Sequence, residues 1–380
     1  MTSPSAAVIT GGEPGSFARS VLAERHPALI ARVREAFPWP PERGRALDAL
    51  LDEITDGVIT PLGPEAHDGG VWDAAHLGRS WFDVPFLWAE SYFYRRLLAA
   101  TGYFRDGPWH GVDPFAPFKR DELRGAVVDE ELAALDGLGA ESGDALLHGA
   151  LWGNRADLGF RISSSADDPA PSHLVADDSG RLWSLLPVGG GAEVHLIADN
   201  AGRELIPDLV LLDHLLHTGR AAEAVLHLKP YPYFVSDATT ADFLAALDRL
   251  RCAPGRARDI GARLWSALGT GRLAVGAHAF FCAPLPYDAM PDDLRRDLSK
   301  ATVTILKGDL NYRRLVGDRL WPATTPFAER VAHFPGPTAA LRTLKSDVVV
   351  GLDTATSTAL DASGQAWRTS GTHALIQVSG

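Results

Sequence analysis

The C-terminal half of the chain alternates short, β-branched apolar runs with amphipathic helical stretches. This alternation is the sequence feature that most limits the possible fold classes. Residues 194–200, 302–310 and 347–352 have the pattern of buried strands, and residues 204–219 have that of an amphipathic helix that stops at Gly219. Regular alternation of this kind places helices on both faces of a mostly parallel sheet. The predicted fold class is therefore α/β, with a doubly wound, Rossmann-like α/β/α domain in the C-terminal half.

The first half of the chain has helical periodicity instead. Apolar residues recur at three- and four-residue spacing over 27–37, 45–58, 84–100 and 143–158, which predicts helices there. The polar stretch 161–180 predicts a loop between two domains. The expected organisation is a disordered tail over 1–16, a helical domain over 17–160, a linker over 161–180 and the α/β/α domain over 181–380.

Charge and composition exclude several classes of protein. The formal net charge of −12 argues against a nucleic-acid partner and against attachment to anionic lipid. No apolar run approaches the length that spans a bilayer, and residues 1–16 lack the basic start and apolar core of a signal peptide. Cys252 and Cys282 are too few for a disulfide framework or a cysteine-based zinc site. We therefore expect a cytoplasmic protein, monomeric by default, with no nucleic-acid or membrane partner.

Open α/β sheets bind ligands at the carboxyl ends of their strands, so the residues at these ends are the first candidates for a functional site. Two carboxylates and an amide oxygen at these ends would form the oxygen-only donor set that Mg²⁺ and Mn²⁺ prefer. Lysines and an arginine beside them suit a phosphate group, and a helix start after Gly202 offers N–H donors to an anion. The residues concerned are Asp199, Asn200, Ser236, Asp237, Lys307, Asp309, Asn311, Arg342 and Lys345.

The composition makes these residues informative. Of the 36 basic residues 31 are Arg and five are Lys, and the chain has three Asn, so a Lys or Asn stands out. Ordinary structural roles remain open for each residue taken alone. An Asp-Asn pair before Gly is often a turn or a helix cap, and Asp237 with its neighbour Ser236 can cap the helix at 240. Arg342 and Lys345 can form a charged surface stripe.

The helical half adds two candidates. Asn154 shares a helix face with Asp157, and such a pair is more often a local hydrogen-bonded cap than a ligand contact. Glu90 lies on an apolar helix face, where it is either buried against Arg95 or Arg96 or pointed into a site.

Absent motifs limit the chemistry. The chain has no GxxxxGK[ST] and no GxGxxG after a strand, which weakens nucleotide and dinucleotide binding as interpretations. It also has no HExxH, no CxxC pair and no GxSxG elbow. The first strand end carries no DxD pair, which argues against an aspartyl-phosphate mechanism.

Four long motifs are distinctive. They are DNAGRELIPDLVLLDHLL (199–216), FVSDAT (234–239), LKGDLNYRRLVGD (306–318) and RTLKSDVVVGL (342–352). They resemble the metal-dependent damage-control phosphatases, also known as domain of unknown function 89, in the branch named after an acidic-residue methyltransferase and marked by an RTxK motif. The likeness runs from about residue 20 to the C-terminus. One departure is visible, because the family often shows H-x-F-W where this chain has His278, Ala279, Phe280 and Phe281.

The resemblance implies that the helical part packs on the α/β/α domain, and that the latter binds metal and is catalytic. It implies a divalent cation (Mn²⁺, Co²⁺, Ni²⁺ or Mg²⁺) held by Asp199, Asn200 and Asp237, with Glu204 in the same pocket. The substrate would be a phosphate monoester of a sugar or a related small phosphometabolite, hydrolysed by a metal-activated water.

Roles follow from this chemistry. We expect Asp237 or Asp309 to orient or deprotonate the water, and Lys307 and Lys345 to offset charge on the phosphoryl oxygens. The expected catalytic residues are thus Asp237, Asp309 and Lys345. The expected substrate-binding residues are Glu90, Asn154, Asp199, Asn200, Glu204, Lys307, Asp309, Asn311, Tyr312, Arg313, Arg342 and Lys345.

Two other functions compete with this interpretation. An S-adenosylmethionine-dependent protein carboxyl methyltransferase would need an adenine pocket around a Gly-rich turn, and the DNAG turn at 199–202 is a poor version of one. A non-catalytic metabolite-binding protein would gain thermal stability from a sugar phosphate without releasing inorganic phosphate.

Overall fold

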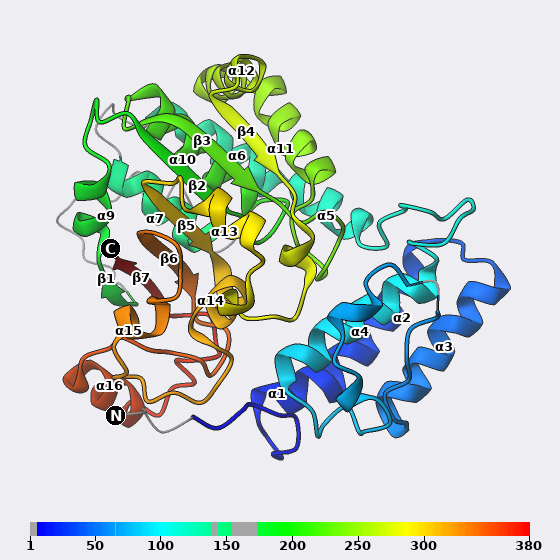
Figure 1. Ribbon diagram of the computed structural model, residues 1–380. Coiled ribbons are helices and arrows are strands. Elements are labelled where there is room, and N and C mark those ends of the chain that lie inside the picture. Colours follow the sequence, from blue (N-terminus) through cyan, green and yellow to red (C-terminus); the bar gives the residue numbers. More distant parts are fainter. Residues whose placement is uncertain (1–5, 65, 138–142, 154–172) are drawn as a thin grey trace.

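The computed structural model describes residues 6–64, 66–137, 143–153 and 173–380. Figure 1 shows a group of N-terminal helices standing beside a sheet that is covered by helices on both faces. No helix in this described part of the chain is long and apolar enough to cross a membrane.

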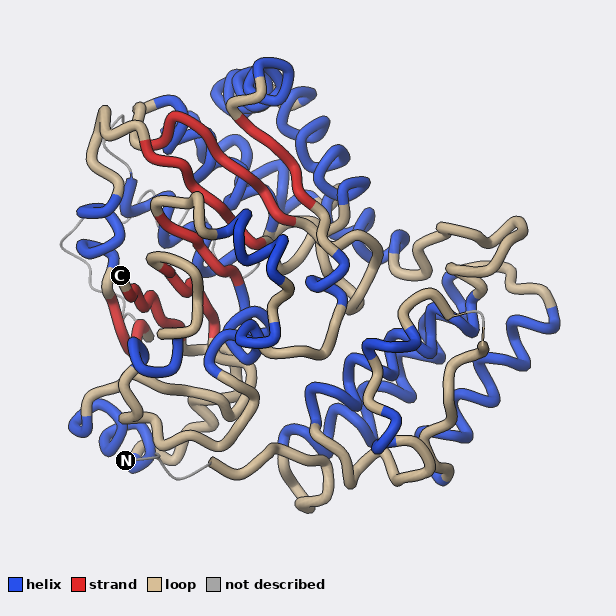
Figure 2. The backbone as a smooth tube through the Cα atoms, in the orientation of Figure 1, coloured by secondary structure: helices blue, strands red, loops and turns tan. Residues whose placement is uncertain are grey.

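Seven strands form one sheet in the order β1-β7-β6-β5-β2-β3-β4. All neighbouring strands pair in parallel except β6 and β7, which are antiparallel. The prediction of a mostly parallel, doubly wound sheet is confirmed (Figure 2). The strands are β1 (Leu174–Asp177), β2 (Ala192–Ile197), β3 (Ala221–His227), β4 (Leu273–Gly276), β5 (Val303–Lys307), β6 (Thr338–Thr343) and β7 (Ala374–Ser379).

Helices make up most of the rest of the described chain. The α-helices are α1 (Phe17–Ser20), α2 (His26–Ala36), α3 (Pro41–Asp56), α4 (Phe86–Thr101), α5 (Ala116–Leu123), α6 (Ala126–Ala134), α7 (Gly143–Trp152), α9 (Ser179–Leu185), α10 (Leu205–His217), α11 (Thr240–Cys252), α12 (Gly255–Thr270), α13 (Asp292–Leu298), α14 (Gly308–Val316), α15 (Phe327–Val331) and α16 (Thr354–Ala362). Shorter turns are the π-helical η1 (Val21–Arg25) and the 3-10 helices η2 (Gly69–Val71), η3 (Ala74–His76), η4 (Leu135–Gly137), η6 (Ala279–Cys282) and η7 (Tyr287–Ala289).

The two faces of the sheet carry separate cores. Successive strand residues point to opposite faces, so Leu196 and Ile197 of β2 belong to different buried clusters. Ile197 packs in the cluster that contains α13, α14 and the helices α1–α4. Leu196 packs in the cluster of α6, α7, α10, α11 and α12. Since α6 and α7 share a core with the sheet, the domain boundaries drawn from the sequence remain a prediction.

Helix α4 is the buried centre of the N-terminal helices. Of its sixteen residues only Arg96 and Ala99 escape burial, because apolar side chains surround the whole helix. The helix ends at Gly102, whose left-handed φ of 86° is the common way to close a helix. This burial holds Glu90 at a fixed place facing α14.

Two local predictions fail near the chain's N-terminus and at the domain junction. Residues 6–16 are not a loose tail, because Ile9 is buried and its carbonyl accepts a hydrogen bond from the N–H of Phe86 at 2.8 Å. Residues 1–5 lie outside the described residues. The predicted loop 161–180 contains strand β1, which pairs with the last strand, β7, so its place depends on a partner about 200 residues away.

The segment 347–352 is buried but is not a strand, and the neighbouring strand lies earlier, as β6. Its backbone bonds to side chains and to a loop instead of to a neighbouring strand. The N–H groups of Gly351 and Leu352 donate to the backbone carbonyls of Thr325 and Ala323. Gln377 Nε2 donates to the Val350 carbonyl at 2.7 Å, and the Val350 N–H donates to the Tyr312 hydroxyl at 3.2 Å. Arg342 donates to the Val348 carbonyl. These side-chain partners let an apolar run lie in the core without sheet pairing.

Tyr312→Phe tests how much the side-chain hydrogen bonds to segment 347–352 stabilise the fold. The change removes the hydroxyl that bonds both Val350 and Gln377, and leaves a buried N–H without a partner. We expect the free energy of unfolding to fall by about 1–3 kcal/mol in urea denaturation. Tyr94→Phe is the control, since the Tyr94 hydroxyl makes no hydrogen bond to the described residues. Equal stability of the two variants would contradict this account of segment 347–352.

Candidate active site

The carboxyl ends of β2 and β5 lie side by side where the chain's connections reverse direction. From β2 the chain continues to β3 on one side of the sheet, whereas from β5 it continues to β6 on the other. Open α/β sheets bind ligands at such a switch point. Asp199 and Asn200 follow β2, and Lys307 and Gly308 lead from β5 into α14. The strand ends chosen from the sequence therefore meet at one place.

Five polar residues named from the sequence form a connected cluster there. Asn200 Nδ2 donates to carboxylate oxygens of Asp199 at 3.2 Å and Glu204 at 2.9 Å. Asn200 Oδ1 accepts from the Ser236 hydroxyl at 2.6 Å. An antiparallel bridge pairs the backbones of Asn200 and Asp237, which joins the loop after β3 to the end of β2.

The carboxylates of this cluster are buried against one another. Asp199, Glu204 and Asp237 are 7%, 8% and 2% exposed. Burial, reinforced by the negative charges of Glu204 and Asp237, raises the pKa of Asp199 well above its usual range. Burial also raises the pKa of Asp237, with Lys229 opposing it. Like charges out of water favour protonation or a bound cation.

The donor set fits a divalent cation. The oxygens of Asp199, Asn200 and Asp237 are hard ligands, which suit Mg²⁺ or Mn²⁺. No arginine or lysine of the described chain forms an ion pair with Asp199 or Asp237, so their charges are not neutralised by a direct protein partner. These are the three residues that the sequence resemblance proposes as metal ligands, and that assignment remains a prediction.

Lys229 belongs to this site, although it was not selected from the sequence. It follows β3, is 1% exposed, and its ammonium finds no hydrogen-bond partner in the described chain. Its positive charge acts on both Asp199 and Asp237. The available signal was its rarity, since it is one of five lysines, but the apolar run around it predicted only an extended segment. A buried cation without a partner is costly, which points to a ligand of opposite charge.

Lys345 is the second cation of the site. Its side chain is half-buried, and among the described residues its ammonium forms no hydrogen bond or ion pair. Its charge lowers the pKa of Asp199, so it faces the acidic cluster. The backbone N–H of Lys345 donates to Asp309 at 3.4 Å, which helps to fix the loop after β6.

Lys307 and Asp309 lie beside the cluster but bond to other parts of the protein. Lys307 Nζ donates to Asp208 Oδ1 at 2.6 Å and to the Ala150 carbonyl at 2.5 Å. Burial raises the pKa of Asp208 to about 6, against the opposing charge of Lys307. Asp309 accepts from Arg342 Nε at 2.8 Å, and although burial opposes ionisation, Arg342 keeps the pKa of Asp309 below its usual value. The side chains of Lys307 and Asp309 are therefore both hydrogen-bonded within the protein.

Glu90 pairs with neither of the arginines considered from the sequence. Arg313 Nη1 donates to Glu90 Oε2 at 2.8 Å, and Arg313 Nε donates to Asp318 at 2.7 Å. Arg95 and Arg96 are paired with Asp68 and Glu53 instead. The Glu90–Arg313 pair therefore joins α4 to α14, and of the two alternatives left open by the sequence, burial of Glu90 against Arg95 or Arg96 is excluded.

Three more predicted substrate contacts are buried and bonded within the protein. Asn311 is 0% exposed and donates to the carbonyls of Ala198 and Lys307, which ties the end of β2 to the start of α14. Tyr312 bonds Gln377, and Arg342 is likewise 0% exposed. Asn154 lies outside the described residues.

Gly308 allows the two strand ends to approach closely. It has a left-handed φ of 84°, and a Cβ at this position would lie 1.8 Å from Asp199 Oδ2. No other residue could occupy this place without displacing the carboxylate. The N-terminus of α14, where backbone N–H groups attract negative charge, thus lies against Asp199.

Fold and site together define an α/β protein with a buried acidic cluster at the sheet's switch point and two lysines there that form no ion pair with the described residues. Residues 21–360 match the model of one protein family, the damage-control phosphatase ARMT1-like domain. The chain belongs to this family, which consists of metal-dependent phosphatases, and is itself an enzyme of the phosphatase class. The resemblance stated from the sequence motifs is confirmed, and the phosphatase is favoured over the methyltransferase.

Relatives match along almost the whole chain. Damage-control phosphatase ARMT1 of Mus musculus is 32% identical, with 99% of each chain covered. The protein of the same name from Xenopus laevis is 34% identical over 96% of this chain and 97% of its own. Among solved structures, a DUF89 family protein from Pyrococcus horikoshii covers 89% of this chain and 94% of its own, with a TM-score of 0.48 and 15% identity.

Gly308→Ala tests the close approach of the strand ends. The methyl group would push Asp199 aside and force a left-handed alanine, so we expect unfolding to become about 1–3 kcal/mol easier and phosphate release to fall with it. The control is Gly269→Ala in α12, where a Cβ meets open space and a helical Ala is favoured. Stability from denaturation and activity from released phosphate are measured on both. Wild-type behaviour of Gly308→Ala would contradict the geometry.

Proposed function

We propose that the chain hydrolyses phosphate monoesters of sugars or related small phosphometabolites in a reaction that depends on a divalent cation. The observation that carries this proposal is the pairing of a buried oxygen cluster with two unpaired lysines at the switch point of the sheet. Cation and phosphate bind adjacent to one another in metal-dependent phosphoryl chemistry. Here the carboxylates would bind the cation and the lysines would bind the phosphate, and the charges of both groups act on Asp199.

Asp199, Asn200 and Asp237 would hold the cation, which is Mn²⁺, Co²⁺, Ni²⁺ or Mg²⁺. When bound, such an ion supplies a Lewis acid for a phosphoryl oxygen and makes water a better nucleophile at neutral pH. Asn200, held by the Ser236 hydroxyl, keeps its oxygen in place while its amino group bridges Asp199 and Glu204.

Asp237 would orient the attacking water. Asp309 was an equal candidate, but its bonds to Arg342 and Ser346 engage the carboxylate oxygen Oδ1 within the protein. Within the described chain the carboxylate of Asp237 accepts one hydrogen bond, at 2.9 Å from the N–H of Phe234, and keeps acceptor capacity for a water.

Lys229 and Lys345 would grip the phosphoryl group. The lysine charges would offset the negative charge on the equatorial phosphoryl oxygens. This stabilisation matters most in the transition state, as the phosphorus–oxygen bond breaks. Lys307 would act through Asp208 by fixing the start of α14, and would not touch the ester directly. Glu204 would accept hydrogen bonds from the hydroxyl groups of the substrate.

We also propose that the protein works as a cytoplasmic monomer. In support, both cysteines are free, and a reducing compartment keeps thiols in that state. The net charge of −12 disfavours nucleic acid and leaves small phosphorylated molecules as the partners.

Asp199→Asn tests the metal role. We expect phosphate release from a sugar phosphate with Mn²⁺, Co²⁺ or Mg²⁺ to fall by on the order of 10²-fold or more, because one ligand charge is lost. EDTA should abolish wild-type activity, and added metal should restore it. Asp52→Asn, at an exposed position, is the control. Activity that survives either EDTA or Asp199→Asn would refute the proposed site.

Lys345→Met tests the phosphate role. The change removes a charge but keeps the length of the side chain, so we expect kcat/KM to fall by roughly 10²-fold while stability stays the same or rises. Lys300→Met, at an exposed lysine, should leave both unchanged. Steady-state kinetics on a sugar phosphate and thermal unfolding give the two readouts. A kcat/KM of Lys345→Met equal to that of Lys300→Met would exclude phosphate binding by Lys345.

A further inference from the structure

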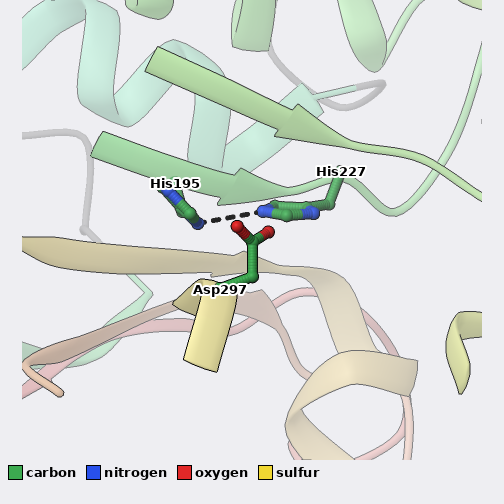
Figure 3. A group of neighbouring side chains, drawn as sticks. All are labelled: His195, His227 and Asp297. Atoms are coloured by element: carbon green, nitrogen blue, oxygen red, sulfur yellow. Dashed lines mark hydrogen bonds between the residues drawn. The ribbon is translucent and has the colours of Figure 1, made fainter. Parts of the chain in front are cut away.

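A second group of metal-capable side chains lies on the sheet, away from the acidic cluster. His195 and His227 come from the neighbouring strands β2 and β3, and Asp297 comes from α13, which covers this face (Figure 3). One ligand atom of each lies within 4.8 Å of the other two. Asp199 is four residues further along the chain from His195, or roughly 13 Å in extended backbone, so one ion cannot serve both groups.

Strand register places the two imidazoles together. Ile197 of β2 pairs with His227 of β3, and His195 is two residues before Ile197, so both histidines point to the same face. His195 Nδ1 and His227 Nε2 are 3.0 Å apart. Two imidazole nitrogens bound to one tetrahedral Zn²⁺ at 2.0–2.1 Å each would be separated by about 3.4 Å. Zinc would replace this hydrogen bond once the two nitrogens moved apart by a few tenths of an ångström and the proton of His227 moved from Nε2 to Nδ1, which leaves a lone pair on both facing nitrogens.

A carboxylate already orients His195 for metal binding. His195 Nε2 lies 2.9 Å from Glu193 Oε1. An ionised carboxylate only accepts hydrogen bonds, so Nε2 carries the proton and the Nδ1 lone pair faces His227 and Asp297. Metal-binding histidines usually have such an outer carboxylate, which fixes the tautomer and makes the ring a better ligand.

Burial and access also suit a metal. His195 and His227 are 0% and 2% exposed, so both rings are enclosed by the protein. The side chain of Asp297 is 43% exposed, which leaves a path from solvent. Its present partner is Lys300, 61% exposed, and surface ion pairs of that kind are weak. A metal could displace it at small cost.

We infer that His195, His227 and Asp297 form a zinc site distinct from the phosphatase site. Two nitrogens and one carboxylate oxygen are a donor set for Zn²⁺, with water in the fourth position, whereas the acidic cluster offers only oxygens. Bound zinc would fasten α13 to β2 and β3. Since α13 precedes β5 in the chain, the ion would hold the strand that ends at Lys307 and leads into Gly308 of α14.

Calorimetric titration with Zn²⁺ of the full chain carrying Asp199→Asn tests this site, because that change weakens the other proposed metal site by removing one carboxylate charge from it. One Zn²⁺ per chain is expected. Adding Asp297→Asn should weaken binding at least tenfold, whereas adding Asp292→Asn, an exposed position on the same helix, should not. His227→Gln is the second variant and should abolish binding. Equal zinc affinity in the Asp297 and Asp292 variants, or no zinc bound in the Asp199→Asn background, would overturn the site.

Phosphate release separates this inference from the proposed function. Asp297→Asn alone should keep the Mn²⁺-dependent release of phosphate while losing zinc-induced thermal stabilisation. Zinc binding by an inactive wild type would count against the phosphatase mechanism only. Metal-dependent activity in a chain that binds no zinc at His227 would count against the zinc site only.

Discussion

Three carboxylates buried at the carboxyl end of β2 set the requirement that the rest of the site must meet. Asp199, Glu204 and Asp237 are each less than a tenth exposed, so they have lost most of their hydration and act on one another through a medium of low dielectric constant. Asn200 supplies neutral bridges but no positive charge. Lys229 and Lys345 supply charge without forming an ion pair to any carboxylate in the described chain. Among the described residues, the site thus has unneutralised carboxylates on one side and unpaired lysines on the other. A cation bound by the carboxylates and an anion bound by the lysines would balance these charges.

Lys229 and Lys345 differ from other cationic side chains around the site, which form ion pairs within the protein. Lys307 is bound to Asp208, Arg342 to Asp309, and Arg313 to Glu90 and Asp318. All of these pairs join segments far apart in sequence except Arg313–Asp318, whose members are five residues apart. Breaking one pair would leave an uncompensated charge at a cost of about 3–5 kcal/mol. They form a rigid frame that fixes the two strand ends and α14. A buried cation with carboxylate and carbonyl partners belongs to this frame, whereas Lys229 and Lys345, which have no such partner among the described residues, are the cations that we propose bind the phosphoryl group.

The sequence predicted the parts of this site that depend on local pattern. The ends of β2 and β5 were recognisable because buried parallel strands are continuous apolar runs, and the scarce Asn200 and Lys345 marked polar positions beside them. Strand β6 was missed because the more apolar run at 347–352 attracted the prediction, and that run is kept out of the sheet by distant side chains such as Gln377. Glu90 pairs with Arg313, 223 residues away, and no local periodicity contains that partner. Lys229 was missed because a lone buried lysine in an apolar run has meaning only once its neighbours are known.

Strand β2 illustrates how one element can present two kinds of chemistry. Its middle offers the imidazole of His195 to the face covered by α13, and its end delivers the oxygens of Asp199 and Asn200 to the switch point. Nitrogen ligands favour Zn²⁺ over Mg²⁺ or Mn²⁺, and all-oxygen ligands reduce that preference. Because a rigid strand holds the two donor sets about 13 Å apart, neither can complete the other's coordination. A fold of this kind can therefore keep a structural ion and a reactive ion separate by ligand type alone.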